Sequence, residues 1–560
     1  QGLSEITHMA LQREGVSLKP DSEWVLSGAV AVAAQEGAIV LPILEDVPES
    51  FHLIIVTGTE KLTANLDEAL VILEAWARFG TGSHLPQRSW VLHGPMATMP
   101  TSTPEPEQTP VPVSGKKGIR SATVIWIDNG RKSLSATYVA PALDCIDCGA
   151  CSDFCPVHFE LGNAFGGSMQ SGRGTSLAGL LEEQPVDAIG GNWVDCLQCE
   201  ACLPYCPTGI DIAGLNRHRG MAADPGDLGP LRLAWIRLTG KRKSMTRRMF
   251  FSNLPLTRRV ARTRIARRWT PALPLEQDRL WQPAVRPLHK SLPVHWVPLH
   301  GNARLKVAYF SDCLGHFFYP QIGMNAHRLL GALGAEIHFP HSHGCCGAPA
   351  YFAGQIQACA QSLLNVLHDF ATWPCDRVVT TSPLCAQVLR RAPEILARSG
   401  LSVTEQQRRQ AEDLAAMVRD ASQVMIEDLE AEAYLQEQPV QRANTVMLLP
   451  SCHQSSDTTA SQQQLLASLP GVTPLPYLHE FGCCGFGGFH AFDRHETSLA
   501  IGRRPLEKLK ESGATYLLTS CTGCLMHLLD TQHHQSPAER EGQVAHLLEF
   551  AGSCLRRKTR

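Results

Sequence analysis

The chain has 560 residues, of which 44% are hydrophobic, and a formal net charge of −3. A chain of this length is expected to form three or four domains, each with enough apolar side chains to bury a core. Its most apolar stretch, Trp24 to Leu44, is interrupted by Gln35-Glu36-Gly37 and so lacks the roughly 18 uninterrupted apolar residues of a spanning helix. No signal peptide is visible. The composition argues against a transmembrane protein and predicts a multidomain chain of mixed α/β and α+β architecture.

Residues 1–140 predict an α/β domain. Trp24 to Pro42 and His52 to Gly58 are apolar and β-branched, as strands are, and the apolar residues of Leu66 to Phe79 recur at the period of a helix. A Pro-, Thr- and Glu-rich stretch at 96–118 predicts a flexible excursion. The alternation of strands and helix indicates an α/β layer.

A β-hairpin is predicted at the end of this domain. Ala122 to Ile127 and Ser133 to Val139 are the expected strands, and Asn129-Gly130 is the expected turn. An Asn-Gly pair readily adopts the positive φ angles of a type I′ turn. The second strand would lead the chain directly into the first cysteine-rich loop.

Two runs of cysteines with the spacing Cys-x-x-Cys-x-x-Cys-x-x-x-Cys-Pro lie within residues 141–225. This spacing is typical of a ferredoxin module with two 4Fe-4S cubane clusters, in which the first three cysteines of a run bind one cluster and the fourth binds the other. Structural zinc also uses Cys-x-x-Cys pairs, but it takes two pairs of ligands rather than three evenly spaced cysteines and a Cys-Pro. The predicted ligand sets of this all-α module are Cys145, Cys148, Cys151 and Cys206, and Cys196, Cys199, Cys202 and Cys155.

Residues 226–300 form a basic and Pro-rich linker. Its segment 232–268 carries 13 Lys and Arg residues and no acidic residue, interleaved with aromatic and aliphatic side chains. That composition is typical of a peripheral contact with anionic lipid, in which each basic residue contributes about 1 kcal/mol. A solvated linker and a strap on an acidic partner or another domain are the alternatives. A nucleic-acid partner is not expected, because no recognised binding module accompanies the strip.

Residues 301–440 and 441–560 repeat one pattern, in which an apolar strand ends on a cysteine and a Cys-Cys-Gly turn follows about thirty residues later. Five thiols in the second copy are one too many for a single cubane, and the first copy has four, with Ser382 where a fifth would stand. The two sites are therefore expected to differ in occupancy. A long helix, Gln406 to Tyr434, is predicted to join the copies. The clustered thiols are Cys313, Cys345, Cys346 and Cys385 in the first copy, and Cys452, Cys483, Cys484, Cys521 and Cys524 in the second.

The cysteine content points to a reducing compartment. Of the 20 cysteines, 17 fall into these clusters, and iron–sulfur clusters with free thiols are favoured where disulfides are reduced. The unclustered Cys359, Cys375 and Cys554 are interpreted as small buried hydrophobic residues. We expect a cytoplasmic protein, with a peripheral membrane contact through 232–268.

The repeat resembles the cysteine-rich CCG domain that is found in heterodisulfide reductases, in the iron–sulfur component of glycolate oxidase and in the lactate-utilisation proteins of the LutA type. The resemblance rests on Gly344-Cys-Cys-Gly-Ala-Pro-Ala350, Ser451-Cys-His453 and Cys483-Cys-Gly-Phe-Gly-Gly488. Residues 21–220 resemble LutB-type proteins, which join an LUD domain to a ferredoxin module, through Ile127-Asp-Asn-Gly-Arg131 and Cys145-Ile-Asp-Cys-Gly-Ala-Cys151. This chain shows no match to the first half of the LUD domain, so it resembles a fusion of a LutB-type part, with a partial LUD domain and a ferredoxin module, and a LutA-type part.

The resemblance implies a non-NAD, L-lactate dehydrogenase-type iron–sulfur oxidoreductase that acts as a subunit of a redox complex. It implies a non-cubane cluster at the five thiols of the second copy, and an ordinary 4Fe-4S cluster or a substrate-access site in the first. Electrons would leave towards a quinone or another carrier. A disulfide or quinone reductase module related to heterodisulfide reductase, and a scaffold with structural clusters, are the alternatives.

Three histidines beside the cysteine turns are candidates for proton transfer, because a pKa near 6.5 suits a base at neutral pH. Hydrogen bonding to cluster sulfur is the alternative role of such residues. No Gly-x-Gly-x-x-Gly follows a strand, so a bound flavin or nicotinamide is not predicted. The candidate histidines are His343, His453 and His479.

Overall fold

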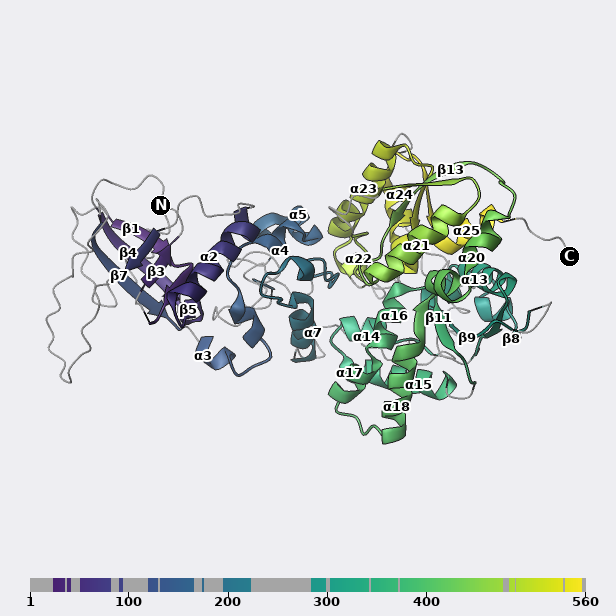
Figure 1. Ribbon diagram of the computed structural model, residues 1–560, viewed down its shortest axis with the longest axis horizontal. Helices are drawn as coiled ribbons and strands as arrows, with labels where there is room; N and C mark the ends of the chain where they lie inside the picture. Colours follow the sequence, from purple (N-terminus) through teal and green to yellow (C-terminus); the bar gives the residue numbers. More distant parts are fainter. Residues whose placement is uncertain are drawn as a thin grey trace, which may run out of the picture. The chain divides into compact units, whose positions relative to one another are not determined.

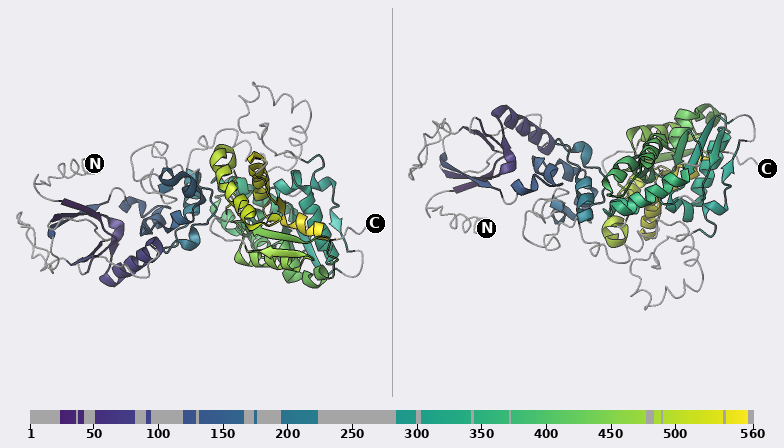
Figure 2. Two further views of the ribbon diagram at one scale, coloured as in Figure 1. Left: turned by 90° about the horizontal axis from the view of Figure 1, so that it is seen from above. Right: turned by 90° about the horizontal axis from the view of Figure 1, so that it is seen from below.

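The structure, a computed structural model, describes residues 24–35, 38–41, 51–81, 90–93, 119–128, 131–165, 174–175, 195–222, 284–298, 303–341, 344–370, 373–476, 483–488, 490–536 and 539–555. They belong to two compact units. Unit 1 comprises the described parts of Gln1–Asp153 and Cys202–Ile210, and unit 2 those of Phe154–Ala178, Pro185–Ala201 and Asp211–Arg560. Figures 1 and 2 show their elements.

Unit 1 contains two small sheets and a covering helix. The predicted helix is confirmed as α2 (Leu66–Thr81), and its Ala69 and Leu73 pack on the second sheet. The central strand of the first sheet is buried on both faces, which explains its unbroken apolar run. The first sheet is parallel, in the order β1 (Trp24–Gly28), β4 (Phe51–Gly58) and β7 (Ile119–Ile127). The second has the order β5 (Leu62–Thr63), β2 (Ala31–Ala33), β3 (Ala38–Leu41) and β6 (Trp90–His93).

The predicted hairpin is wrong. Its first strand exists as part of β7, but β7 pairs in parallel with β4, and the residues after the turn begin the short helix α3 (Arg131–Leu134). The Asp128 carboxylate accepts a hydrogen bond from the backbone N–H of Lys132 at 2.9 Å. Such a cap satisfies one of the free N–H groups at a helix start. Asp128 thus stabilises a helix where the Asn-Gly pair alone predicted a tight turn.

The cysteine-rich region contains short helices in its described part. The chain leaves η2 (Ala140–Asp144) at Cys145, and Cys155 precedes α5 (Pro156–Leu161), where Pro156 has no N–H to leave unsatisfied. The Cys155 sulfur accepts a hydrogen bond from the backbone N–H of His158 at 3.4 Å and so caps this helix. The other elements are α4 (Ala150–Asp153), η1 (Thr59–Lys61), η3 (Gly162–Ala164), η7 (Leu203–Tyr205) and α7 (Ile212–Ala222).

The repeat predicted in the C-terminal part is confirmed as two parallel sheets with one strand order. In each, the second strand lies on one side of the first strand and the third and fourth lie on the other. The first copy adds an antiparallel edge strand, β8. Its sheet has the order β12 (Val418–Asp420), β11 (Arg377–Thr380), β9 (Leu305–Phe310), β10 (Ala335–His338) and β8 (His295–Trp296). The second has the order β14 (Val472–Leu475), β13 (Asn444–Leu449), β15 (Tyr516–Thr519) and β16 (Gln543–His546).

Helices connect and cover both sheets (Figure 1). In the first copy they are α12 (Cys313–Phe317), α13 (Pro320–Ala332), α14 (Ala348–Phe352), α15 (Ile356–Phe370), α16 (Pro383–Arg390) and α17 (Ala392–Arg398), with η9 (Leu288–Lys290) before β9. In the second they are α21 (Ser456–Ser468), α22 (His490–Asp493), α23 (His495–Ser512), α24 (Thr522–His534) and α25 (Leu547–Cys554).

The long helix predicted between the copies is broken. After α18 (Glu405–Met417) the chain enters strand β12, whose buried Val418 pairs with Val378 of β11. The Asp420 carboxylate then caps a new helical segment by accepting from Ser422 N at 2.9 Å. A strand pairing that forms only in the folded chain therefore interrupts the helical pattern. The later segments are α19 (Ala421–Gln423), the π-helical η10 (Val424–Asp428) and α20 (Ala431–Gln436).

One apolar core joins the two copies. Buried side chains of the first copy, including Val307 and Leu330, belong to the same cluster as Leu448, Leu518 and Leu547 of the second. Helix α13 of the first copy also packs on α25 of the second, where the Arg328 guanidinium donates to the Gly552 carbonyl. The two repeats thus form one folded body, in which the position of each cysteine loop is fixed relative to the other.

Candidate iron–sulfur sites

The two Cys-x-x-Cys-x-x-Cys loops adopt the same backbone conformation. Asp147 and Gly149 in the first loop have φ angles of 63° and 77°, and the equivalent Gln198 and Glu200 in the second have 52° and 60°. A positive φ is unfavourable for residues other than glycine. Within the described residues four non-glycine residues have it, and three of them lie in these loops. Strain of this kind collects at ligand sites, so the shared conformation indicates loops that wrap the same kind of group.

The first predicted ligand set lies in unit 1. Burial raises the pKa of the Cys148 thiol, and the neighbouring thiolates of Cys145 and Cys206 raise it further, which places Cys206 beside the first loop although it is distant in sequence. The Lys61 ammonium donates to the Cys145 carbonyl at 3.2 Å. This crossover of the fourth cysteine supports the predicted set of Cys145, Cys148, Cys151 and Cys206.

The second predicted set lies mainly in unit 2. Burial raises the pKa of the Cys155 thiol, and the charges of Cys199 and Cys196 raise it further, so that Cys155 stands beside the second loop. The Asn216 side chain of α7 hydrogen-bonds to Cys196, although burial still raises the pKa of that thiol to about 11. Cys202 belongs to unit 1, and its place in the set stays a prediction.

Backbone N–H groups point at the sulfur atoms in a repeated pattern. The amide two residues further along the chain donates to Cys145, Cys196 and Cys483 at 3.4 Å each. Gly347 N donates to Cys345 Sγ at the same distance. Hydrogen bonds to sulfur stabilise thiolates and tune the potentials of iron–sulfur clusters. The ferredoxin loops and the Cys-Cys-Gly turns therefore share one local device for holding a charged sulfur ligand.

The four clustered thiols of the first copy lie together. Cys346 Sγ and Cys385 Sγ are 3.2 Å apart, and Cys313 and Cys345 are hydrogen-bonded. Gly347 has a φ of 89°, and a Cβ at this position would lie 2.8 Å from Cys359 Sγ, so only glycine fits this turn. The four thiols thus line one buried site.

The second copy gathers its five thiols in the same place. Cys484 Sγ and Cys524 Sγ are 2.8 Å apart, and its hydrogen bonds with Cys484 and Cys521 raise the pKa of Cys524 well above the usual value. Burial raises the pKa of Cys452, with further contributions from Cys199, Cys484 and Cys521. Cys521 is the N-cap of α24, and Ser382 is the N-cap of α16 in the first copy. The structure thus confirms that the serine occupies the position of the fifth thiol.

Both sites lie at the carboxyl ends of parallel strands. Cys313 follows β9, Cys385 follows β11, and the second copy repeats this after β13 and β15. In the first sheet the chain passes from β9 to β10 on one side and from β11 to β12 on the other, and β13 to β16 repeat this arrangement in the second sheet. Such a switch point opens a crevice in which α/β sheets bind their ligands. The fold itself therefore brings the cysteine-bearing loops together.

Within unit 2, the second ferredoxin loop meets the second-copy site directly. A hydrogen bond from the Cys199 thiol to Cys483, together with burial, raises the pKa of Cys199 well above its usual value. Leu197, Val157 and Ile501 pack around these sulfurs in one apolar cluster. The Arg494 guanidinium also lies 2.6 Å from the Asp195 carboxylate. A thiol of the second ferredoxin loop and a thiol of the second-copy site are thus in contact among buried apolar side chains.

The donor set fits iron–sulfur clusters. Within the part of the chain that the structure describes, no group of three or more His, Cys, Asp or Glu side chains is arranged to hold a single metal ion. Soft thiolate ligands select iron–sulfur clusters, zinc and copper(I). Buried thiols crowded together remain protonated unless a cation compensates their charge. The 17 clustered cysteines are free thiols that could hold the iron of such clusters.

Of the three candidate histidines, His453 lies within the described residues, and His343 and His479 lie outside them. Burial lowers the pKa of the His453 imidazole to about 3, with smaller contributions from the guanidinium groups of Arg217 and Arg391. Its buried Nδ1 has no hydrogen-bond partner among the described residues. A group with this pKa is a weak base at neutral pH. His453 is better suited to hydrogen bonding than to proton abstraction.

A charged network near His453 had no signal in the sequence. The Glu200 carboxylate oxygen Oε1 lies 3.2 Å from Arg217 Nη1 and 3.3 Å from Arg391 Nη1. Gln387 donates to the other oxygen at 3.2 Å, and Arg391 donates to the Tyr351 hydroxyl at 3.0 Å. Glu200 directly follows Cys199, and the other partners come from α7 and the first copy. The network therefore ties the second ferredoxin loop to the first copy.

The Asp312 side chain links the two cysteine-rich copies through a hydrogen bond. This buried carboxylate accepts from the Gly315 N–H at 2.7 Å and from the Thr522 hydroxyl at 3.3 Å. Asp312 directly precedes Cys313 of the first copy, and Thr522 directly follows Cys521 of the second. Burial raises the pKa of the Asp312 carboxyl. One hydrogen bond thus couples the positions of the two cysteine-bearing loops.

The basic strip at 232–268 lies outside the described residues. None of the helices in the described part of the chain combines the length and the apolar composition needed to cross a bilayer. The three unclustered cysteines are packed in apolar surroundings, with Cys359 and Cys554 buried and Cys375 partly buried.

Two protein families match this chain. The family model of the cysteine-rich domain CCG matches residues 307–390 and 446–529, which are the two repeats. The family model of the 4Fe-4S dicluster domain matches residues 141–210, which carry the two ferredoxin-type loops. These matches show an iron–sulfur protein with a 4Fe-4S domain and tandem cysteine-rich domains.

Curated relatives match a part of the chain and nearly all of their own length. A protein of Geobacillus thermodenitrificans named lactate utilization protein A is 32% identical over 228 residues, which are 40% of this chain and 90% of that protein. A protein of the same name from Exiguobacterium is 26% identical over 244 residues, 43% of this chain and 96% of its own. A solved structure of a hypothetical protein from Helicobacter pylori matches 78% of each chain with 10% identity and a TM-score of 0.40.

Proposed function

Because the chain belongs to the family of lactate utilization protein A, we propose that it is the iron–sulfur electron-transfer subunit of a complex that oxidises L-lactate or a related 2-hydroxy acid. In this reaction the hydroxy acid becomes the 2-oxo acid and loses two electrons and two protons. A quinone or another carrier takes up the electrons, and a quinone also takes up two protons to become the quinol. Bound clusters would supply sites that accept and release single electrons.

The contact between Cys199 and Cys483 carries the proposal. It joins a thiol of the ferredoxin module to a thiol of the second cysteine-rich domain within one unit, among buried apolar side chains. Two redox groups held by these residues would be neighbours. Electrons that enter at the second copy could therefore move to the ferredoxin residues without leaving the chain.

The five thiols of the second copy are the proposed entry site. They are Cys452, Cys483, Cys484, Cys521 and Cys524, and resemblance to heterodisulfide reductase implies a non-cubane cluster there. The four thiols of the first copy suit an ordinary 4Fe-4S cluster. The ferredoxin sets suit two cubanes, and other subunits would complete the substrate site. Segment 232–268 would provide a peripheral contact with anionic lipid.

Electron paramagnetic resonance on the anaerobically prepared full chain, with its partner subunits, tests the donor. We expect L-lactate to produce a reduced-cluster signal, and we expect Cys199→Ser to weaken it strongly because that variant removes a ligand at the junction. Cys375→Ser is the matched control, since Cys375 lies outside every predicted set and should leave the signal intact. A spectrum that stays silent with L-lactate, glycolate and larger 2-hydroxy acids would contradict the proposed substrate class.

A disulfide or quinone reductase module related to heterodisulfide reductase is the second candidate, favoured by the same five-thiol arrangement. It predicts that a disulfide oxidises, or a quinol reduces, the clusters while 2-hydroxy acids change nothing. The same samples distinguish the two functions. Clusters that respond to no donor or acceptor would leave only a structural role.

A further inference from the structure

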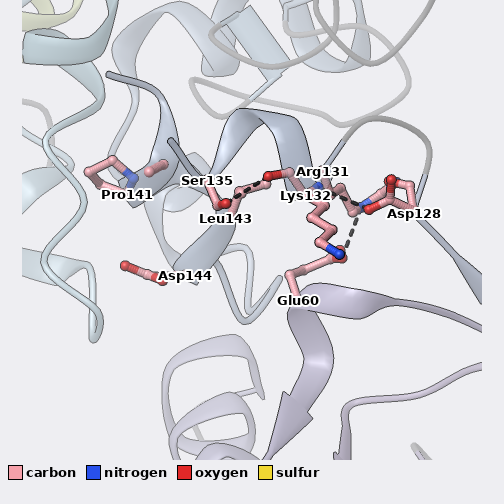
Figure 3. A pocket seen from close by; sticks show the side chains of 9 residues that line it. Glu60, Asp128, Arg131, Lys132, Ser135, Pro141, Leu143 and Asp144 are labelled. Carbon is pink, nitrogen blue, oxygen red and sulfur yellow. Dashed lines mark hydrogen bonds and ion pairs between the residues drawn. The ribbon is translucent and has the colours of Figure 1, made fainter. Parts of the chain in front are cut away.

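Unit 1 contains an open cavity of about 560 Å³ that none of the proposed roles uses. Three segments line it, namely η1, the start of α3 and η2. Figure 3 shows Pro141 and Leu143 on one side of the cavity and Arg131 and Lys132 on the other. A volume of 300 to 1,000 Å³ is typical of small-molecule sites. The cavity is therefore large enough for a ligand with one or two rings.

The cavity wall continues into the first ferredoxin loop. Asp144 lines the cavity and is followed by Cys145, which ends η2. Lys61, next to the lining residue Glu60, donates from its ammonium to the Cys145 carbonyl at 3.2 Å. A molecule bound in the cavity would lie against the loop that carries the first ligand of the predicted cluster. This position suits an electron carrier that exchanges electrons with that cluster.

The charges of the lining select against anions. Arg131 and Glu60 neutralise each other at 2.8 Å, and both side chains are largely buried. That leaves the carboxylates of Asp128 and Asp144 against one ammonium, that of Lys132. A carboxylate or phosphate ligand would meet net repulsion in this setting. Lactate, pyruvate and nucleotides are therefore poor candidates for this cavity.

A neutral ring with carbonyl oxygens fits the remaining features. The Lys132 ammonium has no ion-pair partner among the described residues and can donate a hydrogen bond to a carbonyl. Ala140, Pro141 and Leu143 supply apolar surface for the ring. We propose that this cavity binds the quinone that accepts electrons from the first ferredoxin-type cluster, an inference that rests on the proposed electron-transfer function. Two electrons arrive through the cluster ligands and two protons come from water, and the product is the quinol.

Binding of a soluble naphthoquinone to the oxidised full chain, followed by calorimetry, tests the site without a donor or turnover. We expect one saturable site, with an affinity that L-lactate and pyruvate leave unchanged. Ser135→Trp fills the cavity from the exposed residue that follows α3 and should weaken binding at least tenfold. Ala136→Trp is the matched control, because Ala136 is also exposed, lies next to Ser135 and does not line the cavity.

Lys132→Met provides a second variant that adds no bulk and removes the proposed donor. It should weaken naphthoquinone binding about tenfold, since a hydrogen bond from a charged group is worth that much. Reoxidation of dithionite-reduced protein by the naphthoquinone should slow in parallel in both variants. Binding that is not saturable, or that Ser135→Trp and Lys132→Met leave unchanged, overturns the site. Neither assay needs a 2-hydroxy acid, so a failure of lactate to reduce the clusters would contradict the proposed donor and leave this test valid.

Discussion

The two cysteine-rich copies share a strand order and a left-handed glycine in the Cys-Cys-Gly turn, with φ angles of 89° at Gly347 and 86° at Gly485. They differ at one helix cap, where Ser382 in the first copy replaces Cys521 in the second. They also hold the second ferredoxin loop differently, the first copy through the Glu200 network and the second through Cys199 and Cys483. The fold sets where ligands can stand, and single residues at those places decide what each copy does.

The largest difference between the two copies is expected when a thiol is removed at equivalent positions. Cys483→Ser takes away both a second-copy ligand and the contact with the ferredoxin loop. We expect lactate-dependent reduction of the ferredoxin clusters to fall by about 100-fold or more, because even outer partners of metal ligands are worth about 10- to 100-fold. Cys345→Ser, at the matched position of the first copy, should lower it much less. Stopped-flow absorbance with iron analysis measures both, and equal losses in the two variants would remove the assigned difference.

Adding a thiol should make the first copy resemble the second. Ser382→Cys places a fifth sulfur at the N-cap of α16, where Cys521 stands in α24. We expect the Mössbauer spectrum of the first-copy iron to shift towards that of the second copy, and Cys521→Ser to cause the reverse. Ser362→Cys, at a buried serine of α15 that belongs to none of the predicted ligand sets, is the control. An unchanged spectrum in Ser382→Cys would show that the cap residue does not determine cluster type.

The ion pairs around Glu200 should be the main electrostatic interaction between the second ferredoxin loop and the first copy. Glu200→Gln leaves two partly buried guanidinium groups without their shared carboxylate. We expect the free energy of unfolding to fall by about 3 kcal/mol. Glu405→Gln removes an exposed i,i+4 pair with Arg409 and should cost about 0.3–0.5 kcal/mol. Chemical denaturation measures the free energy of unfolding of both variants. A loss in Glu200→Gln as small as that in Glu405→Gln would contradict a stabilising role of the network.

A smaller effect concerns the second copy and pH. Burial raises the pKa of the Glu549 carboxyl on α25 from 4.5 to about 7. Between these values the unfolded chain loses this proton while the folded chain keeps it, so stability falls as pH rises from 4.5 to about 7 and then levels off. The loss should be about 3 kcal/mol. Glu549→Gln should flatten this part of the stability profile measured by denaturation, and an identical profile in both proteins would count against the raised pKa.

Much of this architecture could be predicted from the sequence because its signals are local. The buried parallel strands β9 and β13 are continuous apolar runs, and the cysteine spacings specify the loops that carry them. The crossover that brings Cys206 to Cys148 follows from the same spacing. The equivalence of Ser382 and Cys521 follows from the internal repeat.

The errors arose where distant or competing contacts decide the structure. The cap that Asp128 provides to α3 outweighed the turn preference of Asn-Gly, and the pairing of Val418 with Val378 interrupted the expected helix. The contact between Glu200 and Arg391 joins residues 191 positions apart. No local pattern reports such a pair, because both residues are common on solvated helix surfaces.

Iron and acid-labile sulfide per chain, measured on anaerobically purified protein, test the central claim most directly. Two ferredoxin-type clusters and one four-iron cluster in the second copy predict about twelve iron and twelve sulfide per chain, or about sixteen of each if the first copy is also filled. A colourless protein that contains zinc or no metal at these cysteines would contradict the account.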